Sequence, residues 1–172
     1  MTTDQKGAIA EIAVAAEAVK LGIDVYRPVA EGGRCDMIFD LETRLLRVQC
    51  KWATRRGEVL VINCRSARRC AEGFIRRTYT SEEIDAIAAY SLDLDRCFLI
   101  PIRRVEGRPA IQLRLSPSLN NQRRRINWAD DFDLAATLLA HQGAVAQLGE
   151  RRHGMAEVTG SSPVGSMRDP SP

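Results

Sequence analysis

Residues 36–52 read DMIFDLETRLLRVQCKW, and this stretch decides the fold. Its two ends, 36–39 and 45–52, have the length and the apolar pattern of β-strands, and the polar residues between them favour a turn. We therefore predict a β-hairpin. Side chains on a strand alternate between its two faces, so the position of each polar residue in this hairpin also predicts which side of the sheet it reaches.

Oxygen donors and an ammonium group meet in this hairpin. Asp36 and Gln49, facing each other across an antiparallel ladder, offer oxygen ligands to a hard divalent cation, with the main-chain carbonyl of Cys50 as another. Lys51 shares a face with Gln49 and would orient or deprotonate a water beside a scissile phosphate. Glu11, on the helix before the hairpin, would complete the metal shell directly or through water. The pattern indicates a metal-dependent nuclease, although an Asp followed by Q-x-K is also common on ordinary exposed strands.

The flanking segments predict a mixed α/β sheet. An apolar stripe of helical spacing follows Thr3 and Asp4, which can cap a helix that runs to Leu21. Further strands are expected over 25–29, 59–63, 97–102 and 111–115, a second helix from Ser81 with Ile84, Ile87 and Ala88 as its apolar face, and a last helix capped by Asp130 or Asp131 and running to Ala140. The order predicts a core of the type αβββαβ, flanked by helices.

Positive charge is concentrated between Arg44 and Arg77. This segment has ten Lys and Arg residues against two Glu, a net +8 in a chain whose total is +3. Such a band can dock a phosphate backbone, or it can be a solvated basic face. The expected DNA contacts are Arg55 and Arg56, directly after the catalytic strand, and then Arg65, Arg68 and Arg69.

Composition favours one intracellular domain. A length of 172 residues and a hydrophobic share of 45% suit a single packed core, and no apolar run is long enough to span a bilayer. The five cysteines lack C-x-x-C spacing and nearby paired histidines, which argues against a zinc site or a complete disulfide framework. We expect reduced thiols in a cytoplasmic, nucleoid-associated protein that is not secreted.

Four short motifs lie in a register that resembles one enzyme family. They are Gly7-x-x-Ala10-Glu11, Gly22-x-Asp24-Val25-Tyr26-x-Pro28, Arg34-Cys35-Asp36-Met37-Ile38 and Arg47-Val48-Gln49-Cys50-Lys51. They resemble the PD-(D/E)XK endonucleases, particularly small bacterial group I intron-encoded homing endonucleases. The resemblance continues through Tyr79, the expected helix at Glu83-Ile84-Asp85-Ala86, Tyr90, Phe98-Leu99-Ile100-Pro101, Asn121-Gln122 and Ile126-Asn127-Trp128-Ala129. The resemblance covers about residues 6 to 133.

This resemblance implies a restriction-endonuclease-like core, Mg²⁺ as cofactor with Mn²⁺ as a substitute, and site-specific cleavage of double-stranded DNA. It places the catalytic set at Glu11, Asp36, Gln49 and Lys51, with the metal held by Asp36, Gln49 and Glu11. Cutting both strands of a duplex requires two active sites, so a homo-oligomer is expected.

Two departures from the family pattern keep alternatives open. Cys35 replaces the proline before the key aspartate, and Gln49 replaces the motif's carboxylate, which removes one negative charge from the metal site. A non-catalytic DNA-binding accessory module therefore remains an alternative, as does a repair or junction-resolving nuclease on the same fold.

The composition changes near Gly143 to a tail without periodicity. We expect a nuclease domain over 1–140 and a disordered tail over 141–172. Residues 143–166 also resemble the conceptual translation of a bacterial transfer RNA gene, because suitable third bases give all four arms of a cloverleaf in one frame. The hypothesis is that the reading frame runs on into such a gene, and the gene's nucleotide sequence tests it.

Overall fold

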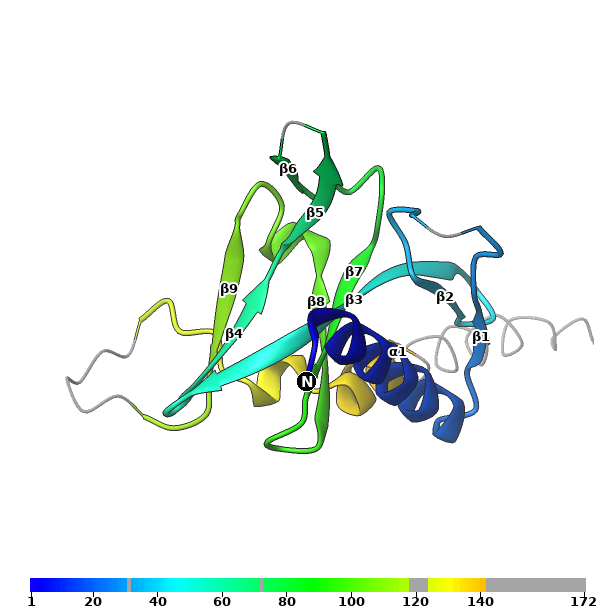
Figure 1. Cartoon of the computed structure of the whole chain (residues 1–172). Helices are drawn as coiled ribbons and strands as arrows, with labels where there is room; N and C mark the ends of the chain where they lie inside the picture. The colour runs from blue at the N-terminus through cyan, green and yellow to red at the C-terminus, as the bar shows by residue number, and fades with distance from the viewer. Residues whose placement is uncertain (31, 72, 118–123, 142–172) are drawn as a thin grey trace, which may run out of the picture.

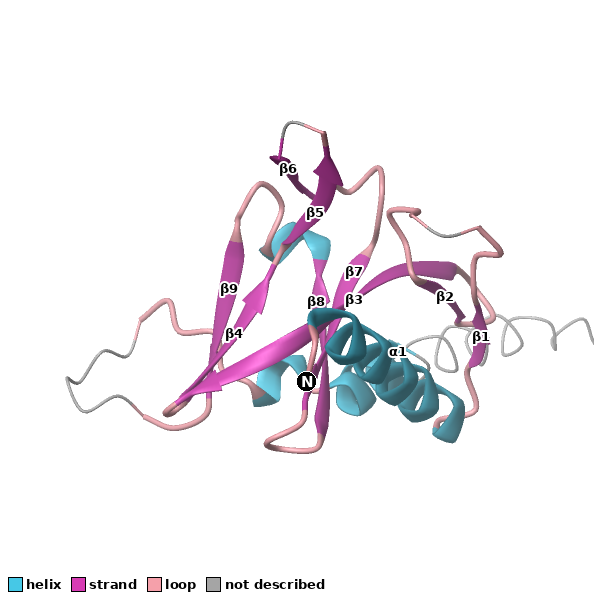
Figure 2. Cartoon of the chain, viewed as in Figure 1, coloured by secondary structure: helices cyan, strands magenta, loops and turns pink. Residues whose placement is uncertain are grey.

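The computed structural model describes residues 1–30, 32–71, 73–117 and 124–141 (Figures 1 and 2). In chain order its elements are α1 (Thr3–Lys20), β1 (Asp24–Tyr26), β2 (Met37–Asp40), β3 (Leu45–Arg56), β4 (Val59–Asn63), β5 (Arg65–Cys70), β6 (Gly73–Thr78), β7 (Ala86–Ser91), β8 (Arg96–Pro101), η1 (Ile102–Arg104), β9 (Ala110–Arg114) and η2 (Asp130–Phe132). Residues 134–141 are also helical. Seven strands form one mixed sheet, and β5 pairs with β6 in a separate antiparallel ribbon. The predicted fold class, a mixed α/β sheet flanked by helices, is confirmed.

Strand β3 connects the parts of the large sheet. Its residues 45–48 pair antiparallel with β2, residues 48–52 pair in parallel with β7, and residues 53–56 pair antiparallel with β4. Pairing with β2 therefore ends where pairing with β7 begins. The predicted hairpin is present, and its two strands separate beside Gln49 and Cys50.

Helix α1 covers one face of this sheet (Figure 1). Its buried stripe of Ala10, Val14 and Ala18 packs in one apolar cluster with Val48 and Cys50 of β3. Small side chains let the helix approach the strands closely, and burying this stripe removes apolar surface from water. The packing fixes α1, and with it Glu11, over the middle of β3.

The opposite face of the sheet carries a second apolar cluster. Ile87 of β7 and Phe98 and Ile100 of β8 point into it, together with Phe132 of η2. All six residues of β7 are buried, because the strand lies between β3 and β8 and is covered on both faces. A strand that is buried on both faces does not alternate between polar and apolar residues.

The predicted second helix is wrong. Residues 81–83 form a turn, and the apolar run after it is the strand β7 rather than a helix. Ile84, Ile87 and Ala88 have helical spacing, but every residue of this run is apolar or small, so the spacing does not select one face. Pairing with β3 and β8 supplies the hydrogen bonds that a helix would have made internally.

Helix caps also differ from those predicted. The cap of α1 is Thr2, whose hydroxyl accepts from the Gln5 N–H at 3.2 Å while the Gln5 side chain accepts from the Thr2 N–H at 2.8 Å. This reciprocal capping box replaces the expected Thr3 and Asp4 cap. The last helix is capped by the Asp133 side chain, which accepts from the Ala136 N–H at 3.1 Å. Asp130 belongs to the short helix η2 before it.

The thiols expected from the composition are free where the structure describes them. Cys50, Cys64 and Cys97 are buried and Cys35 is partly buried, all as free cysteines. Burial raises the pKa of the Cys64 thiol to about 11 and that of Cys97 to about 12. These two groups are therefore inert neutral thiols near pH 7.

The predicted tail falls on residues 141–172, of which the structure describes only His141. Its expected disorder and its link to a transfer RNA gene lie outside the described residues and stay predictions. Within the described part of the chain, no helix combines the length and the apolarity needed to cross a membrane.

Candidate active site

The site forms where β2 ends beside β3. The N–H of Asp36 donates to the Val48 carbonyl at 2.9 Å, which fixes this residue one position before β2. The Asp36 carboxylate then accepts from the Cys50 N–H at 2.8 Å and from the amide of Gln49. Strand β2 pairs with β3 only as far as Val48, so the Asp36 carboxylate accepts the Cys50 N–H in place of a backbone carbonyl of β2. Gln49 is only 7% exposed, so this pairing satisfies a buried polar group.

The backbone of Cys50 also faces this site. The N–H and C=O groups of one strand residue point toward the same neighbour, so the Cys50 carbonyl lies on the Asp36 side of β3. Its thiol takes the other direction, into the core, with Sγ 3.8 Å from the Met37 sulfur. Burial, and then the charges of Asp36 and Glu11, raise the pKa of that thiol well above its ordinary value, while Lys51 lowers it. Asp36 accepts from the Cys50 N–H, and Lys51 is the next residue along β3.

Glu11 approaches the site from α1. It lines a pocket of about 410 Å³ whose described walls also include Asp36, Cys35 and the loop between β1 and β2. The carboxylate of Glu11 forms an ion pair with Arg27 from that loop. The Arg27 side chain is 59% exposed, so solvent screens this pair strongly.

Lys51 lies on the same face of β3 as Gln49 and opposite Ala89 of the parallel strand β7. Its Nζ is 5.1 Å from the centre of the Tyr79 ring. That distance is within the range over which an ammonium is attracted to an aromatic face. Within the described part of the chain, the Lys51 side chain contacts this ring and forms no ion pair with a carboxylate.

Three of the predicted site residues are linked at the fork where β2 and β3 separate: Asp36 contacts Gln49 and lines one pocket with Glu11. Lys51 lies two residues farther along β3, on the same face as Gln49. Two carboxylates, Glu11 and Asp36, can contribute oxygen ligands, and Gln49 and the Cys50 carbonyl can add neutral ones. No group of three or more His, Cys, Asp or Glu side chains in the described residues is placed to hold a metal ion. The donor set suits a hard cation only if the amide and the main-chain oxygens take part.

Comparison with known proteins gives the family. The family model of the PD-(D/E)XK endonucleases matches residues 1–135, which include the whole fork. The chain belongs to the PD-(D/E)XK endonuclease family. Among solved structures, it is similar to the bacterial homing endonuclease I-Ssp6803I, with 25% sequence identity, a TM-score of 0.65, and coverage of 86% of this chain and 99% of that one. Comparison with curated proteins finds no match.

In this PD-(D/E)XK endonuclease the basic band divides into two places. Arg55 and Arg56 lie at the tip of the β3–β4 hairpin, where Arg55 donates to the Gly57 carbonyl at 2.9 Å. Arg65 begins β5 at the other end of β4, and Arg68 and Arg69 follow on the same strand, paired with Ile75 and Phe74. A five-residue strand separates the two places, a span of about 17 Å. Figure 1 shows the hairpin tip at the lower left and the ribbon at the top.

Arg34 and Glu83, to which the sequence analysis gives no role, lie beside the candidate site, since Arg34 contacts the same Tyr79 ring as Lys51. Arg34 Nη2 donates to Glu83 at 2.8 Å, and the Arg34 guanidinium lies 4.2 Å from the centre of the Tyr79 ring. Arg34 is two residues before Asp36 in the same motif, and this closeness in the sequence is a signal that the Arg34 side chain lies near the site. The sequence offers no partner for it, because Glu83 belongs to the helix predicted from Ser81.

Proposed function

We propose that the chain is a magnesium-dependent, site-specific endonuclease that hydrolyses phosphodiester bonds of double-stranded DNA. Direct attack by water, without a covalent intermediate, suits a site that holds carboxylates and a lysine but no activated nucleophile. The observation that carries the proposal is the contact of Asp36 with Gln49 and the Cys50 N–H, beside Lys51 on the same strand face, in a member of an endonuclease family.

The donor set supports a divalent metal at the fork. Nucleases of this family generally use divalent metal ions. Asp36 and Glu11 line one pocket, and the Cys50 carbonyl lies on the Asp36 side of β3. With the Gln49 amide turned so that its oxygen replaces the nitrogen beside Asp36, these groups would supply the all-oxygen shell of Mg²⁺, or of Mn²⁺ in its place. Such an ion would polarise a phosphoryl oxygen and offset the charge on the leaving oxygen.

The chain's own residues would do the rest of the chemistry. Lys51 would hold the attacking water near the scissile phosphate and accept or direct its proton. Asp36 keeps the Cys50 N–H and the Gln49 amide in place, so the oxygens of the fork are arranged before substrate arrives. Glu11 would reach the shell by exchanging its exposed ion pair with Arg27.

Gln49 favours one alternative function. Its amide is neutral, and as placed it donates to Asp36 rather than offering its oxygen in that direction. A site with one carboxylate fewer binds a cation more weakly. A non-catalytic DNA-binding module on the same fold would keep this hydrogen-bonded arrangement and never require the metal.

DNA would be held at the two basic places of the chain. Arg55 and Arg56 are exposed at the hairpin tip, about 13 Å along β3 from Lys51. Arg65, Arg68 and Arg69 belong to a two-stranded ribbon, an element that fits the width of the DNA major groove. Contacts at both places would fix the duplex across the fork.

Cleavage of both strands requires two sites, and we infer a homo-oligomer for this reason. The free thiols described above suit a reducing compartment, and a DNA substrate suits the nucleoid.

Cleavage of plasmid DNA that carries the gene's own genomic flank tests the function. Purified protein is incubated with Mg²⁺ or with chelator, beside Asp36→Ala and Lys51→Ala. We expect discrete magnesium-dependent products that both variants fail to make. Lys20→Ala is the matched control, because this exposed lysine at the end of α1 pairs with Glu17 and should leave cleavage unchanged.

Two results would contradict the proposal. No cutting by the parent with Mg²⁺ or Mn²⁺, together with salt-sensitive DNA binding, would support the binding module. Cutting by Lys51→Ala at the parent rate would remove the role assigned to that residue.

A second experiment tests the DNA contacts. Fluorescence anisotropy of labelled duplex is measured over a range of salt concentrations for the parent, Arg65→Ala and Arg55→Ala. Removing one arginine that binds a phosphate should reduce the slope of log affinity against log salt by about 1. Arg103→Ala, an exposed arginine on η1, is the control, and an equal reduction of the slope there would show that the effect is only net charge.

A further inference from the structure

Two cations share the buried ring of Tyr79. This residue directly follows β6 and is only 3% exposed. The Lys51 ammonium lies 5.1 Å from its ring centre, and the Arg34 guanidinium carbon lies 4.2 Å from it. An aromatic face attracts cations, so the ring is a common contact for a residue of the site and a residue outside it.

Arg34 is itself fixed by the base of the β5–β6 ribbon. Its guanidinium donates to the Ser66 hydroxyl on β5 and to the Thr78 carbonyl on β6, the latter at 2.7 Å. It also donates to Glu83 at 2.8 Å. Contacts to both strands and to the following turn place Arg34 at the point where the ribbon joins the body of the protein.

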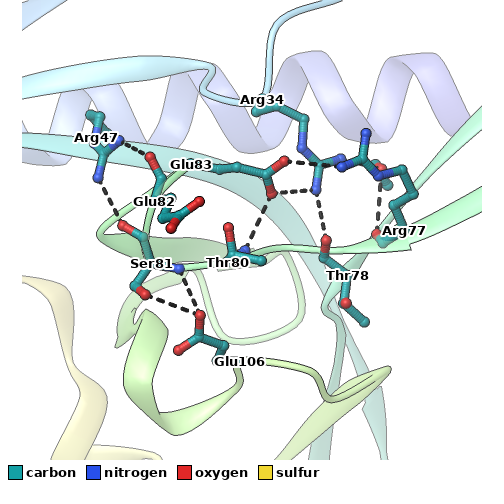
Figure 3. A network of polar contacts seen from close by, with 10 residues as sticks. Arg34, Arg47, Arg77, Thr78, Thr80, Ser81, Glu82, Glu83 and Glu106 are labelled. Carbon is teal, nitrogen blue, oxygen red and sulfur yellow. Dashed lines mark hydrogen bonds and ion pairs between the residues drawn. The ribbon is translucent and has the colours of Figure 1, made fainter.

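Glu83 completes this network, as Figure 3 shows. Its carboxylate lies between Arg34 and Arg77, at 2.8 Å and 3.5 Å, and accepts from the Thr80 N–H at 3.2 Å. The hydrogen bond from Arg34 is the main reason that the pKa of Glu83 is lowered, so the carboxylate stays ionised near pH 7. The Arg34 Nε is buried with no hydrogen-bond partner in the described residues, and the Tyr79 ring is the aromatic contact of this guanidinium.

The Lys51 side chain needs a contact that fixes its position. A lysine side chain has four rotatable carbon bonds and a compact charge, so by itself it occupies many positions. A catalytic group must hold its productive geometry before the substrate binds. In the described residues, the Tyr79 ring is the contact of Lys51 that does this.

We propose that Tyr79 is a positioning residue for Lys51, and that Arg34 fixes Tyr79 relative to the β5–β6 ribbon. Nucleic acid bound along the ribbon is thereby coupled to the lysine through Arg34 and one aromatic ring. The inference rests on the proposed nuclease function for its kinetic consequence, but the placement of the lysine is measurable without cleavage.

Nuclear magnetic resonance of the lysine side chains measures that placement. The chain has only three lysines, Lys6, Lys20 and Lys51, so their ¹³C-labelled Cε signals are easily assigned. We expect a ring-current shift of the Lys51 signal that Tyr79→Phe retains and Tyr79→Leu abolishes. Lys6 lies 5.7 Å from the Trp52 ring and is the internal control, because its shift should be the same in both variants.

Kinetics supply the second measurement. Tyr79→Leu should lower kcat about tenfold with KM for DNA unchanged, and Tyr79→Phe should restore the parent kcat. Arg34→Lys, which keeps the charge but loses the planar guanidinium, should move the Lys51 signal and lower kcat several-fold. Arg104→Lys is its matched control, since that arginine lies 5.5 Å from the Phe132 ring, away from the fork.

Two outcomes would overturn the inference. One is a Lys51 signal that is the same in Tyr79→Leu and the parent. The other is a Tyr79→Phe variant as impaired as Tyr79→Leu, since the ring alone would then not be the guide. If Tyr79→Leu does not fold, an unchanged Lys51 signal in Arg34→Lys overturns the coupling. Failure of the nuclease function is separate: it would appear as absent cleavage while the lysine spectra still respond to Tyr79.

Discussion

The β2–β3 hairpin and the β5–β6 ribbon are both antiparallel pairs, but they are supported in different ways. In the hairpin, Met37, Phe39 and Val48 are completely buried under α1. The ribbon is a separate two-stranded sheet, and Ile75 on it is 53% exposed. An isolated pair of strands is barely stable alone, so the ribbon depends on its base at Arg34. The proposed catalytic groups, which need a fixed geometry, are in the packed hairpin, and three of the arginines expected to contact DNA, Arg65, Arg68 and Arg69, are on the ribbon.

The largest effect should come from the charge at the fork. Asp36→Asn keeps an acceptor for the Cys50 N–H but removes a negative ligand, so cleavage should fall about 10²- to 10⁴-fold while the fold is retained. Single-turnover cleavage and thermal unfolding measure the two quantities. A comparable fall in cleavage caused by Arg65→Ala on the ribbon would contradict the division between the two regions.

Truncating an apolar side chain should lower the free energy of unfolding much more in the hairpin than in the ribbon. Phe39→Ala in the hairpin should lower the free energy of unfolding by about 3–5 kcal/mol, because it empties a fully buried site. Ile75→Ala on the ribbon should change it by less than about 0.5 kcal/mol. Denaturant unfolding monitored by circular dichroism gives both values. Similar losses in the two variants would mean that the ribbon is packed as firmly as the hairpin.

Restoring the motif's carboxylate at position 49 should strengthen Mg²⁺ binding at the site. Gln49→Glu places a second negative charge beside Asp36, so the protein should be less stable in chelator and recover with Mg²⁺. The Mg²⁺ concentration for half-maximal cleavage should fall about tenfold. Gln112→Glu on the exposed face of β9 is the control. An unchanged Mg²⁺ requirement would show that residue 49 is not a ligand.

The smallest effects are expected for the carboxylates of Asp85 and Glu83, which form ion pairs with arginines of the hairpin and at the base of the ribbon. Arg47 beside Asp85, and Arg34 beside Glu83, lower the pKa of each acid. A lowered folded-state pKa gives stability that is present above the ordinary pKa and lost as the pH falls through the lowered one. Asp85→Asn and Glu83→Gln should each cost under about 1 kcal/mol at pH 7, and the difference from the parent should vanish well below pH 4. A difference that persists at low pH would assign the effect to packing instead.

The hairpin and the relative placement of its polar residues were predictable from the sequence because local rules decide them. Period-two alternation places Gln49 and Lys51 on one face, and the turn between the strands brings Asp36 opposite. The position of Glu11 followed from the resemblance to the family. Its ion pair with Arg27 did not, because that contact depends on the path of the loop between β1 and β2.

The strand β7 and the ribbon were missed for physical reasons. In β7 both faces are buried, so the residues from Ala86 to Ser91 do not alternate between polar and apolar, and the helical spacing of Ile84, Ile87 and Ala88 favoured a helix. The ribbon has the opposite property: none of its residues whose burial is described is buried, so burial marks no alternation along them. The Arg34–Glu83 contact joins residues 49 positions apart, which no local pattern predicts.

The parallel pairing of β3 with β7 also has a consequence for how the protein is made. The hairpins β2–β3 and β3–β4 join neighbouring segments and can close early, whereas Gln49 meets Ile87 only after an intervening 37 residues have been synthesised and looped back. The segment of β3 that carries Gln49 and Lys51 is the one that waits for this long-range closure. If Gln49 and Lys51 act as proposed, a nascent chain would form its apolar hairpin well before its catalytic centre and could not cleave DNA until β7 had paired with β3.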